Sequence, residues 1–227
     1  MADRAYVLSQ FLKDTAEHRL EVLREDGLYR HLRCRKPGTY CYGFDIVTWP
    51  GHLAITGDMG ASAFCRLDDM LHFFRTTDDR HDQAGGLSIN AGYWAEKLVA
   101  NDGNRLEFEA SLFRDYVKER FDAYVAERAD EDDVLPAWAP ELWAELEESV
   151  LFDEEGEGAV TIAIQKMTDF EPDGEQYKSF RFHDAWESSS SLQRHTFCFT
   201  WRLYAIAWAV RAYDAACAAR ELEAAHG

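Results

Sequence analysis

Lysine and arginine are absent from residues 129–165, which make up about one sixth of the 227-residue chain. This stretch holds twelve acidic residues and therefore carries −12 of the formal net charge of −18. The acids are Asp130, Glu131, Asp132, Asp133, Glu141, Glu145, Glu147, Glu148, Asp153, Glu154, Glu155 and Glu157. The field of such a chain opposes the approach of DNA or RNA, so we expect no direct nucleic-acid binding.

The sequence also lacks the features of an exported or membrane-bound protein. Residues 1–14 carry charges throughout and contain neither an apolar core nor a small-residue cleavage site. The longest apolar stretch, 196–213, is interrupted by Arg202 and Arg211 and falls short of the roughly 20 residues that cross a bilayer. We therefore expect no membrane contact and a location in the cytoplasm.

Motifs that hold a metal or a cofactor are missing as well. The five cysteines include no C-x2-C pair, and the histidines include no H-x-H or H-x3-H pair. No phosphate-binding GxxxxGK[ST], metalloprotease HExxH or hydrolase GxSxG motif occurs. We expect reduced thiols, no metal and no cofactor, and we favour a non-enzymatic function. An enzyme built from scattered residues stays open, because catalytic groups meet in space rather than in sequence.

The first third of the chain predicts a helix followed by a β-meander. Helical spacing of apolar residues covers 3–17, and two alternating runs flank the turn dipeptide Asp26-Gly27. Further strands are predicted at 40–49, 52–56 and 61–66, and a short helix closes the meander at 67–75. The fold class is therefore α+β, with an antiparallel five-stranded meander packed by helices.

The remaining two thirds predict mostly helix. We expect helices at 90–102 and 105–128, a short helix around Trp138 and Trp143, strands at 158–167 and 179–187, and a largely apolar C-terminal helix at 195–224. One compact domain, 1–227, is predicted. It comprises the helix, meander and following helix of 1–76, the helical part 77–128, the acidic segment 129–158, and the strands and buried C-terminal helix of 159–227.

The stretch GFDIVTWPGHLAITGDMGASAFCR, residues 43–66, permits two interpretations. Glycine-rich turns between strands account for Pro50-Gly51 and for 57–60, with Asp58 binding its own turn and His52 beginning a strand. Alternatively, Asp45, His52 and Asp58 form a polar cluster at one end of the sheet, for catalysis or metal binding. Turn chemistry is sufficient, and we favour it.

Two groups of basic residues also need partners. Arg30, Arg33, Arg35 and Lys36 lie on or next to one predicted strand, where we expect them to meet acids of this chain or of a partner. Arg202 lies within the apolar C-terminal helix, so it should pair with a carboxylate. Asp184, Glu187 and Asp45 are the candidates.

Several segments together resemble a widespread family of uncharacterised phage and prophage proteins. They are RHLRCRKPGTYCYGFDIVTWPGHLAITGDMGASAFCRLDDMLHFFR, INAGYWAEKL, SFRFHDAWE and FTWRLYAIAWAVRAYDAA, in that order. The resemblance covers most of the chain except the acidic segment, and it carries no catalytic residue over. It implies an accessory protein that acts in the cytosol of an infected bacterial cell.

Charge and context together predict a protein-binding inhibitor. Its acidic surface would occupy a basic groove of a host defence protein, as a nucleic-acid mimic or an anti-CRISPR-like protein does. The binding residues would be Asp130, Glu131, Asp132, Asp133, Glu145, Glu147, Glu148, Asp153, Glu154, Glu155 and Glu157. A solvated acidic run without a partner is the simpler explanation of the same charge. The alternatives are a small phage enzyme with the Asp45, His52 and Asp58 site, or a self-associating structural or regulatory module, such as a homodimer, that buries Trp138 and Trp143 against a second copy.

Overall fold

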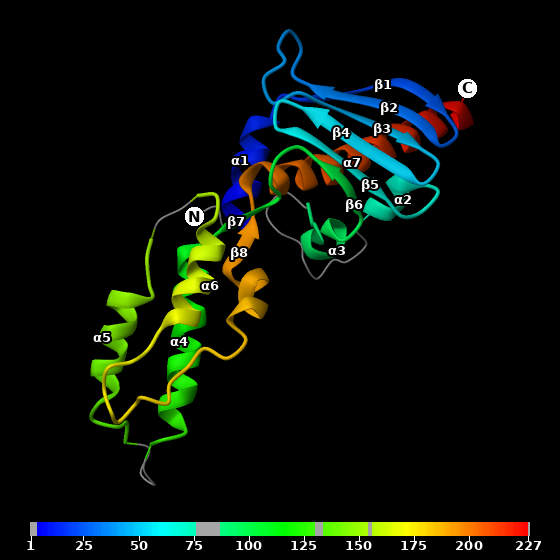
Figure 1. Cartoon of the computed structure of the whole chain (residues 1–227). Coiled ribbons are helices and arrows are strands. Elements are labelled where there is room, and N and C mark those ends of the chain that lie inside the picture. Colours follow the sequence, from blue (N-terminus) through cyan, green and yellow to red (C-terminus); the bar gives the residue numbers. More distant parts are fainter. Residues whose placement is uncertain (1–3, 76–86, 130–133, 154–155, 227) are drawn as a thin grey trace. The chain divides into compact units, whose positions relative to one another are not determined.

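The computed structural model describes residues 4–75, 87–129, 134–153 and 156–226. The chain divides into two units, Met1–Arg105 with His195–Gly227, and Leu106–Arg194. We call the first the sheet unit and the second the helical unit (Figure 1). The helical unit is thus an insertion into the sequence of the sheet unit, where the sequence predicted one compact domain. Each unit is described by itself.

The sheet unit contains an antiparallel sheet in which six described strands follow one another in chain order. They are β1 (Arg19–Asp26), β2 (Tyr29–Arg35), β3 (Phe44–Trp49), β4 (His52–Gly57), β5 (Gly60–Cys65) and β6 (Leu98–Asn101). The turns lie where the sequence predicts them, and Gly51 and Gly60 adopt φ of 81° and 88°. Glycine reaches these angles without the steric cost that a side chain would bring. The predicted meander is confirmed in its antiparallel order, with one strand more than expected.

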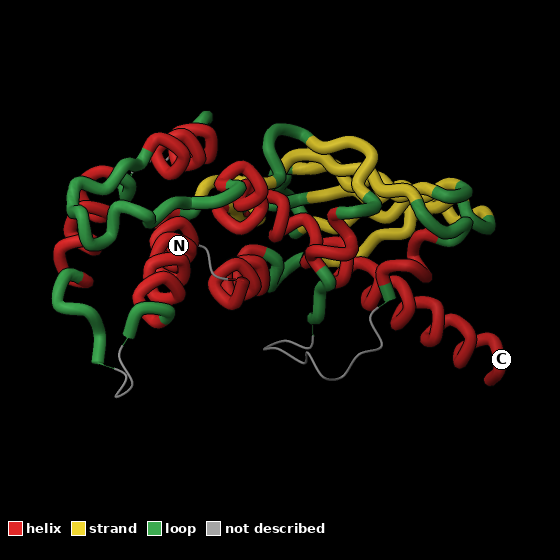
Figure 2. The backbone as a smooth tube through the Cα atoms, turned by 60° about the horizontal axis from the view of Figure 1, so that its bottom comes forward, coloured by secondary structure: helices red, strands yellow, loops and turns green. Residues whose placement is uncertain are grey.

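One face of this sheet is covered by helices. Figure 2 shows the strands on one side and the helix that ends at the C-terminus on the other. This helix, α7 (Phe197–His226), packs together with α1 (Arg4–Asp14) and α2 (Met70–Phe74). Phe11, Phe44 and Trp201 meet at the centre, where the Trp201 ring makes edge contacts with both phenylalanine rings. Burial of such aromatic and aliphatic surface supplies most of the stability of the unit.

The opposite face of the sheet has a different character. Asp45, Val47 and Trp49 alternate along β3 with the buried Phe44, Ile46 and Thr48, and so lie on this second face. Ala54 and Ala63 are register partners on β4 and β5, and both are only partly buried. The face therefore mixes small, polar and partly exposed apolar side chains, and it contributes little to the core.

The structure corrects the predicted helical part 77–128 in two places. The helix predicted at 90–102 is only five residues long, α3 (Ala91–Ala95), after which the chain forms the edge strand β6. The helix predicted at 105–128 begins later, as α4 (Ala110–Ala126), because Leu106–Phe108 form a short strand, β7. Residues 77–86 of this predicted part lie outside the described residues.

The helical unit has its own core, formed by three helices and a 3-10 helix. The three helices are α4, α5 (Ala139–Ser149) and α6 (Ala159–Asp169). The 3-10 helix η2 (Ala185–Leu192) follows them in the chain and packs against α4 and α6. Phe113, Leu142 and Leu146 are fully buried in this core. At the boundary with the sheet unit, β7 pairs with β8 (Gln193–His195), so the strands that enter and leave the unit lie side by side.

Two predicted strands of the helical unit are wrong. Residues 159–169 form α6, in which Ala159, Ala163 and Met167 are buried at four-residue steps. Val160, Ile162 and Ile164 alternate along the same residues, so the sequence satisfies both the helical and the strand period. Residues 179–187 form no strand either, although Phe180 and Phe182 are buried at the alternation of a strand.

Gly57 provides a test of the sheet geometry. A Cβ atom at Gly57 would meet the Gly43 carbonyl and would lie 2.7 Å from the Cα of Phe44. We expect Gly57→Ala to lower the free energy of unfolding by about 1–3 kcal/mol, because backbone atoms must move. Gly92→Ala is the control, since nothing lies within 4 Å of its Cβ position in α3. Urea unfolding followed by tryptophan fluorescence measures both, and equal effects would contradict this geometry.

Candidate functional site

The negative charge of the protein is concentrated in the helical unit. Residues 106–194 contain 24 acids and 8 bases, and therefore carry a formal charge of −16. The other 138 residues contain 18 acids and 16 bases, which leaves −2. The excess acid thus extends beyond the 129–158 segment to the whole unit, whereas the sheet unit is nearly neutral.

The few bases of the helical unit are occupied within the unit itself. Ion pairs link Arg114 to Glu147, Lys118 to Asp122, Arg128 to Glu127, Lys178 to Glu175, and Arg194 to Glu107 and Glu109. Lys166 and Arg181 donate to backbone carbonyls, and Arg120 lies over the Tyr116 ring. Six of the 18 described acids of the unit are thus paired, and twelve have no cation partner among the described residues.

Helix α5 presents part of this acid in a defined geometry. Pro140 lies in the first turn, where its missing N–H costs nothing, and Leu142 and Leu146 fix one face of the helix in the core. Glu141 and Glu148 project from the exposed part of α5 and have no partner among the described residues. They lie seven residues apart, which is close to two helical turns, so both carboxylates share one side of the helix.

The other two glutamates of α5 have internal partners. Glu147 pairs with Arg114, at 2.8 Å. Glu145 accepts hydrogen bonds from the Tyr177 hydroxyl and from the Asp173 backbone N–H. The bond to Glu145, followed by burial, raises the pKa of Tyr177 to about 12. Both glutamates were predicted to bind a partner, and in the structure they also hold α5 to its neighbours.

The remaining predicted acids divide into two groups. Asp153 and Glu157 are exposed next to α5 and α6. The others lie outside the described residues: Asp130, Glu131, Asp132, Asp133, Glu154 and Glu155. The described exposed acids of this segment are therefore Glu141, Glu147, Glu148, Asp153 and Glu157.

Aromatic side chains anchor the acidic helix. The Trp143 ring lies 5.1 Å from the Phe121 ring, and the Trp138 ring lies 5.9 Å from Tyr124 and 5.5 Å from Tyr177. Both tryptophans are partly buried within the helical unit. The exposed tryptophan of this unit is instead Trp186, at 67%. The anchors hold α5 against α4 and the 171–182 segment despite the repulsion among the carboxylates.

The basic strand does not form one positive patch. Arg30 lies on the helical face of the sheet, where it pairs with Asp69, whereas Arg33 and Arg35 lie on the other face. Arg33 pairs with Asp45, Lys36 pairs with Glu17, and Arg35 lies over the Tyr40 ring. These cations therefore meet acids and an aromatic ring of this chain, one of the outcomes that the sequence predicted.

The structure does not bring Asp45, His52 and Asp58 together. Asp45 is the register partner of Thr56, four residues along β4 from His52. His52 begins β4 as predicted, stacks on Trp49 and contacts the Pro50 carbonyl through Nδ1. Asp58 accepts from the backbone N–H of Tyr42, at 2.9 Å, rather than binding its own turn. Tyr42 has a positive φ of 53°, so this bond holds a strained residue in place.

Asp45 instead belongs to a polar cluster that spans the adjacent strands β2 and β3. His31 Nε2 lies 2.7 Å from Asp45 Oδ2, and Arg33 donates two hydrogen bonds to the same carboxylate. Partial burial acts to raise the pKa of Asp45, but the bonds from Arg33 and His31 outweigh it and lower the pKa. A carboxylate held by an arginine and a histidine in this way is a structural arrangement, because these bonds stabilise its ionised form and leave it a poor proton acceptor.

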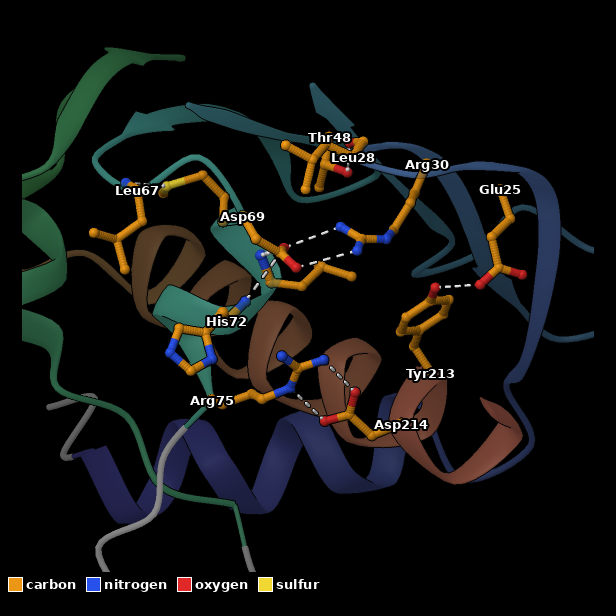
Figure 3. Close-up of polar contacts among 12 residues, drawn as sticks. Glu25, Leu28, Arg30, Thr48, Leu67, Asp69, His72, Arg75, Tyr213 and Asp214 are labelled. Atoms are coloured by element: carbon orange, nitrogen blue, oxygen red, sulfur yellow. Dashed lines mark hydrogen bonds and ion pairs between the residues drawn. The ribbon is translucent and has the colours of Figure 1, made fainter. Parts of the chain in front are cut away.

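A second polar network joins the helical face of the sheet to α2 and α7. Figure 3 shows Arg30 between Asp69 and Tyr213, and Arg75 paired with Asp214. Arg220 and the Tyr213 hydroxyl both donate to Glu25, and these bonds lower the pKa of Glu25. Each of the three arginines has a carboxylate partner, so the network fixes α7 to the sheet and carries no excess charge.

Arg202 has different partners from those predicted. Its Nη1 donates to the Met59 carbonyl and its Nη2 to the Asn101 side-chain oxygen, at 2.9 Å for the second bond. Burial lowers the pKa of this guanidinium. Of the predicted carboxylates, Asp184 and Glu187 belong to the helical unit, and Asp45 is bound by Arg33 and His31. The prediction of a carboxylate partner was therefore wrong, because two neutral oxygen acceptors bind Nη1 and Nη2, while the buried Nε has no hydrogen-bond partner among the described residues.

Features of other functional classes are not seen in the described residues. Within 4–75, 87–129, 134–153 and 156–226, no three His, Cys, Asp or Glu side chains group to hold a metal ion. In the same ranges, none of the helices combines the length and the apolar character that a membrane span requires. Comparison of the chain with protein-family models, with curated proteins and with solved structures finds no match. The resemblance to phage proteins stays a prediction.

Proposed function

We propose that this protein is a non-enzymatic binding protein whose helical unit occupies a basic surface of a partner protein. The observation that carries the proposal is the −16 charge of that unit, whose eight bases are all occupied within it. Unneutralised carboxylates on an anchored scaffold create a negative field that steers a basic partner and complements its surface. The partner would be a host protein with a nucleic-acid-binding groove, and the context a phage-type accessory function in the bacterial cytosol.

Order in the acidic surface supports a specific complex over a merely solvated acidic run. Glu141 and Glu148 lie on a helix that Trp138, Trp143 and Leu142 fix in the core. Carboxylates held in place lose less conformational entropy on binding than those of a flexible tail, which favours affinity and specificity. Catalysis has less support, because the described candidate residues Asp45, His52 and Asp58 lie apart and each contacts its own neighbours.

Capture from bacterial lysate, followed by competition with duplex DNA, tests this function. The double variant Glu141→Gln, Glu148→Gln removes two unpaired charges from α5 and should weaken capture about three- to tenfold, since complementary charge speeds association. The matched control is Glu221→Gln, Glu223→Gln, which removes the same charge from the exposed end of α7. We expect the control to bind as the unmodified protein does.

The salt dependence and the competition decide the outcome. Capture should fall between 50 and 500 mM NaCl, because salt screens the attraction, and duplex DNA should displace the partner. Capture that is indifferent to salt and to DNA would contradict the proposal. An equal loss in the α7 control would show that net charge alone, and not the surface around α5, is responsible.

A further inference from the structure

A pocket of about 420 Å³ opens on the helical unit, between α6 and the end of α5. Its wall on α6 consists of Ile162, Gln165, Lys166 and Asp169. These residues recur at three- and four-residue steps and therefore share one side of the helix, opposite the buried Ala163. Phe170, Glu171 and Ser149 complete the lining. The volume lies within the roughly 300–1,000 Å³ of sites that receive small ligands or side chains.

The pocket lining contains two acids, Asp169 and Glu171, and one base, Lys166, and therefore carries a formal charge of −1. Lys166 donates from Nζ to the Ser149 carbonyl, at 2.9 Å, so its ammonium group serves the C-terminal end of α5. Asp169 and Glu171 are exposed and have no partner among the described residues. Two carboxylates without partners thus lie at a pocket that also contains the Gln165 amide.

Apolar surface accompanies these carboxylates. The Ile162 side chain is 46% exposed, and Phe170 is held against Phe180 and Phe182 in the core. An exposed isoleucine beside two free carboxylates suits a ligand that has an apolar stem and a cationic end. Both lysine and arginine meet this description, but they differ at the cationic end.

We propose that this pocket receives an arginine side chain of the basic partner, an inference that rests on the proposed function. The guanidinium group is planar, carries five N–H donors in a fixed geometry and is weakly hydrated, so it can bind two carboxylates and an amide oxygen at once. Its methylene stem would lie along Ile162. A lysine ammonium is a compact, strongly hydrated point charge and would gain less from the same surroundings.

Two basic peptides of equal charge separate this inference from general attraction. Fluorescein-labelled hexa-arginine and hexa-lysine are titrated with the full-length protein at 100 mM NaCl, and fluorescence anisotropy gives each dissociation constant. The unmodified protein should bind hexa-arginine about five- to tenfold more tightly than hexa-lysine, because charge-assisted bidentate bonds favour the guanidinium. Asp169→Asn, Glu171→Gln should reduce this preference to within about twofold.

The control is Glu141→Gln, Glu148→Gln, which makes the same charge change outside the pocket. It should weaken both peptides alike and leave the arginine preference intact. Thermal unfolding confirms that the variants are folded, as their exposed positions lead us to expect. An arginine preference that is absent from the unmodified protein, or that survives in the pocket variant, overturns the inference. Failure of both peptides to bind at all would instead contradict the proposed function.

Discussion

Replacing Arg202 by alanine is expected to lower the free energy of unfolding of the sheet unit by about 2–4 kcal/mol. Arg202 is only 2% exposed, and its guanidinium connects α7 to the β4–β5 turn and to the end of β6. Alanine removes both hydrogen bonds and leaves the volume of the side chain empty. The Met59 carbonyl would then lose its bond from Nη1, whereas the Asn101 side-chain oxygen would keep only its bond from the Ser62 hydroxyl.

Two further variants identify the origin of this effect. Arg202→Met refills the volume of the methylene stem and places no charged group in the interior. It should therefore be much less destabilising than alanine, because an apolar residue of similar volume can replace a buried charged one at little cost. Arg66→Ala, at an exposed arginine, should change stability by less than about 0.5 kcal/mol. Urea unfolding of the three variants gives the comparison. An effect of Arg202→Ala as small as that of Arg66→Ala would contradict the bridging role.

The meander could be predicted from the sequence because its signals are local. Asp26-Gly27, Pro50-Gly51 and the 57–60 turn each define a reversal, and the flanking residues alternate between the core and the second face. β6 lacked such a signal, since it has only four residues and follows a helix directly. Its position depends on pairing with β5, which lies more than thirty residues earlier in the chain.

The helical unit was harder to predict, because its segments satisfy two periodicities. Residues 159–169 fit a strand as well as a helix, and only the buried row of Ala159, Ala163 and Met167 distinguishes the two. Phe180 and Phe182 are buried at the alternation that suggested a strand, but burial at period two does not require a strand partner.

The charge of the candidate site could be counted in advance, whereas its pairing could not. The sequence shows the excess of acid in 129–165 directly, and a short helix around Trp138 and Trp143 was predicted within it. Glu145 and Glu147 were expected to bind a partner protein, but Tyr177 and Arg114 bind them within the unit. These partners lie 32 and 33 residues away, a distance over which sequence spacing carries no information on contact.

Asp69→Asn is expected to cost about 1.5–3 kcal/mol at pH 7, because it removes the carboxylate that neutralises Arg30. The Arg30 side chain is only 11% exposed and donates two hydrogen bonds to Asp69, at 3.0 and 3.1 Å (Figure 3). Asp69 also caps α2, accepting from the backbone N–H groups of Leu71 and His72. Asparagine caps a helix as well as aspartate does, so the variant removes the ion pair and keeps the cap.

The same variant predicts how stability depends on pH. Partial burial acts to raise the pKa of Asp69, but the bonds from Arg30 outweigh it, so the pKa in the folded protein is lowered. A carboxyl group whose pKa is lower in the folded than in the unfolded protein stabilises the fold at pH values above its unfolded pKa of about 4. This stabilisation is lost as the pH falls through the folded pKa. The difference between the unmodified protein and Asp69→Asn should therefore shrink between pH 5 and pH 2, as urea unfolding at several pH values can show. Asp68→Asn, at the exposed neighbour, should leave the pH dependence unchanged. If instead the difference in unfolding free energy between the unmodified protein and Asp69→Asn is the same at every pH in this range, Arg30 does not depend on the ionised carboxylate.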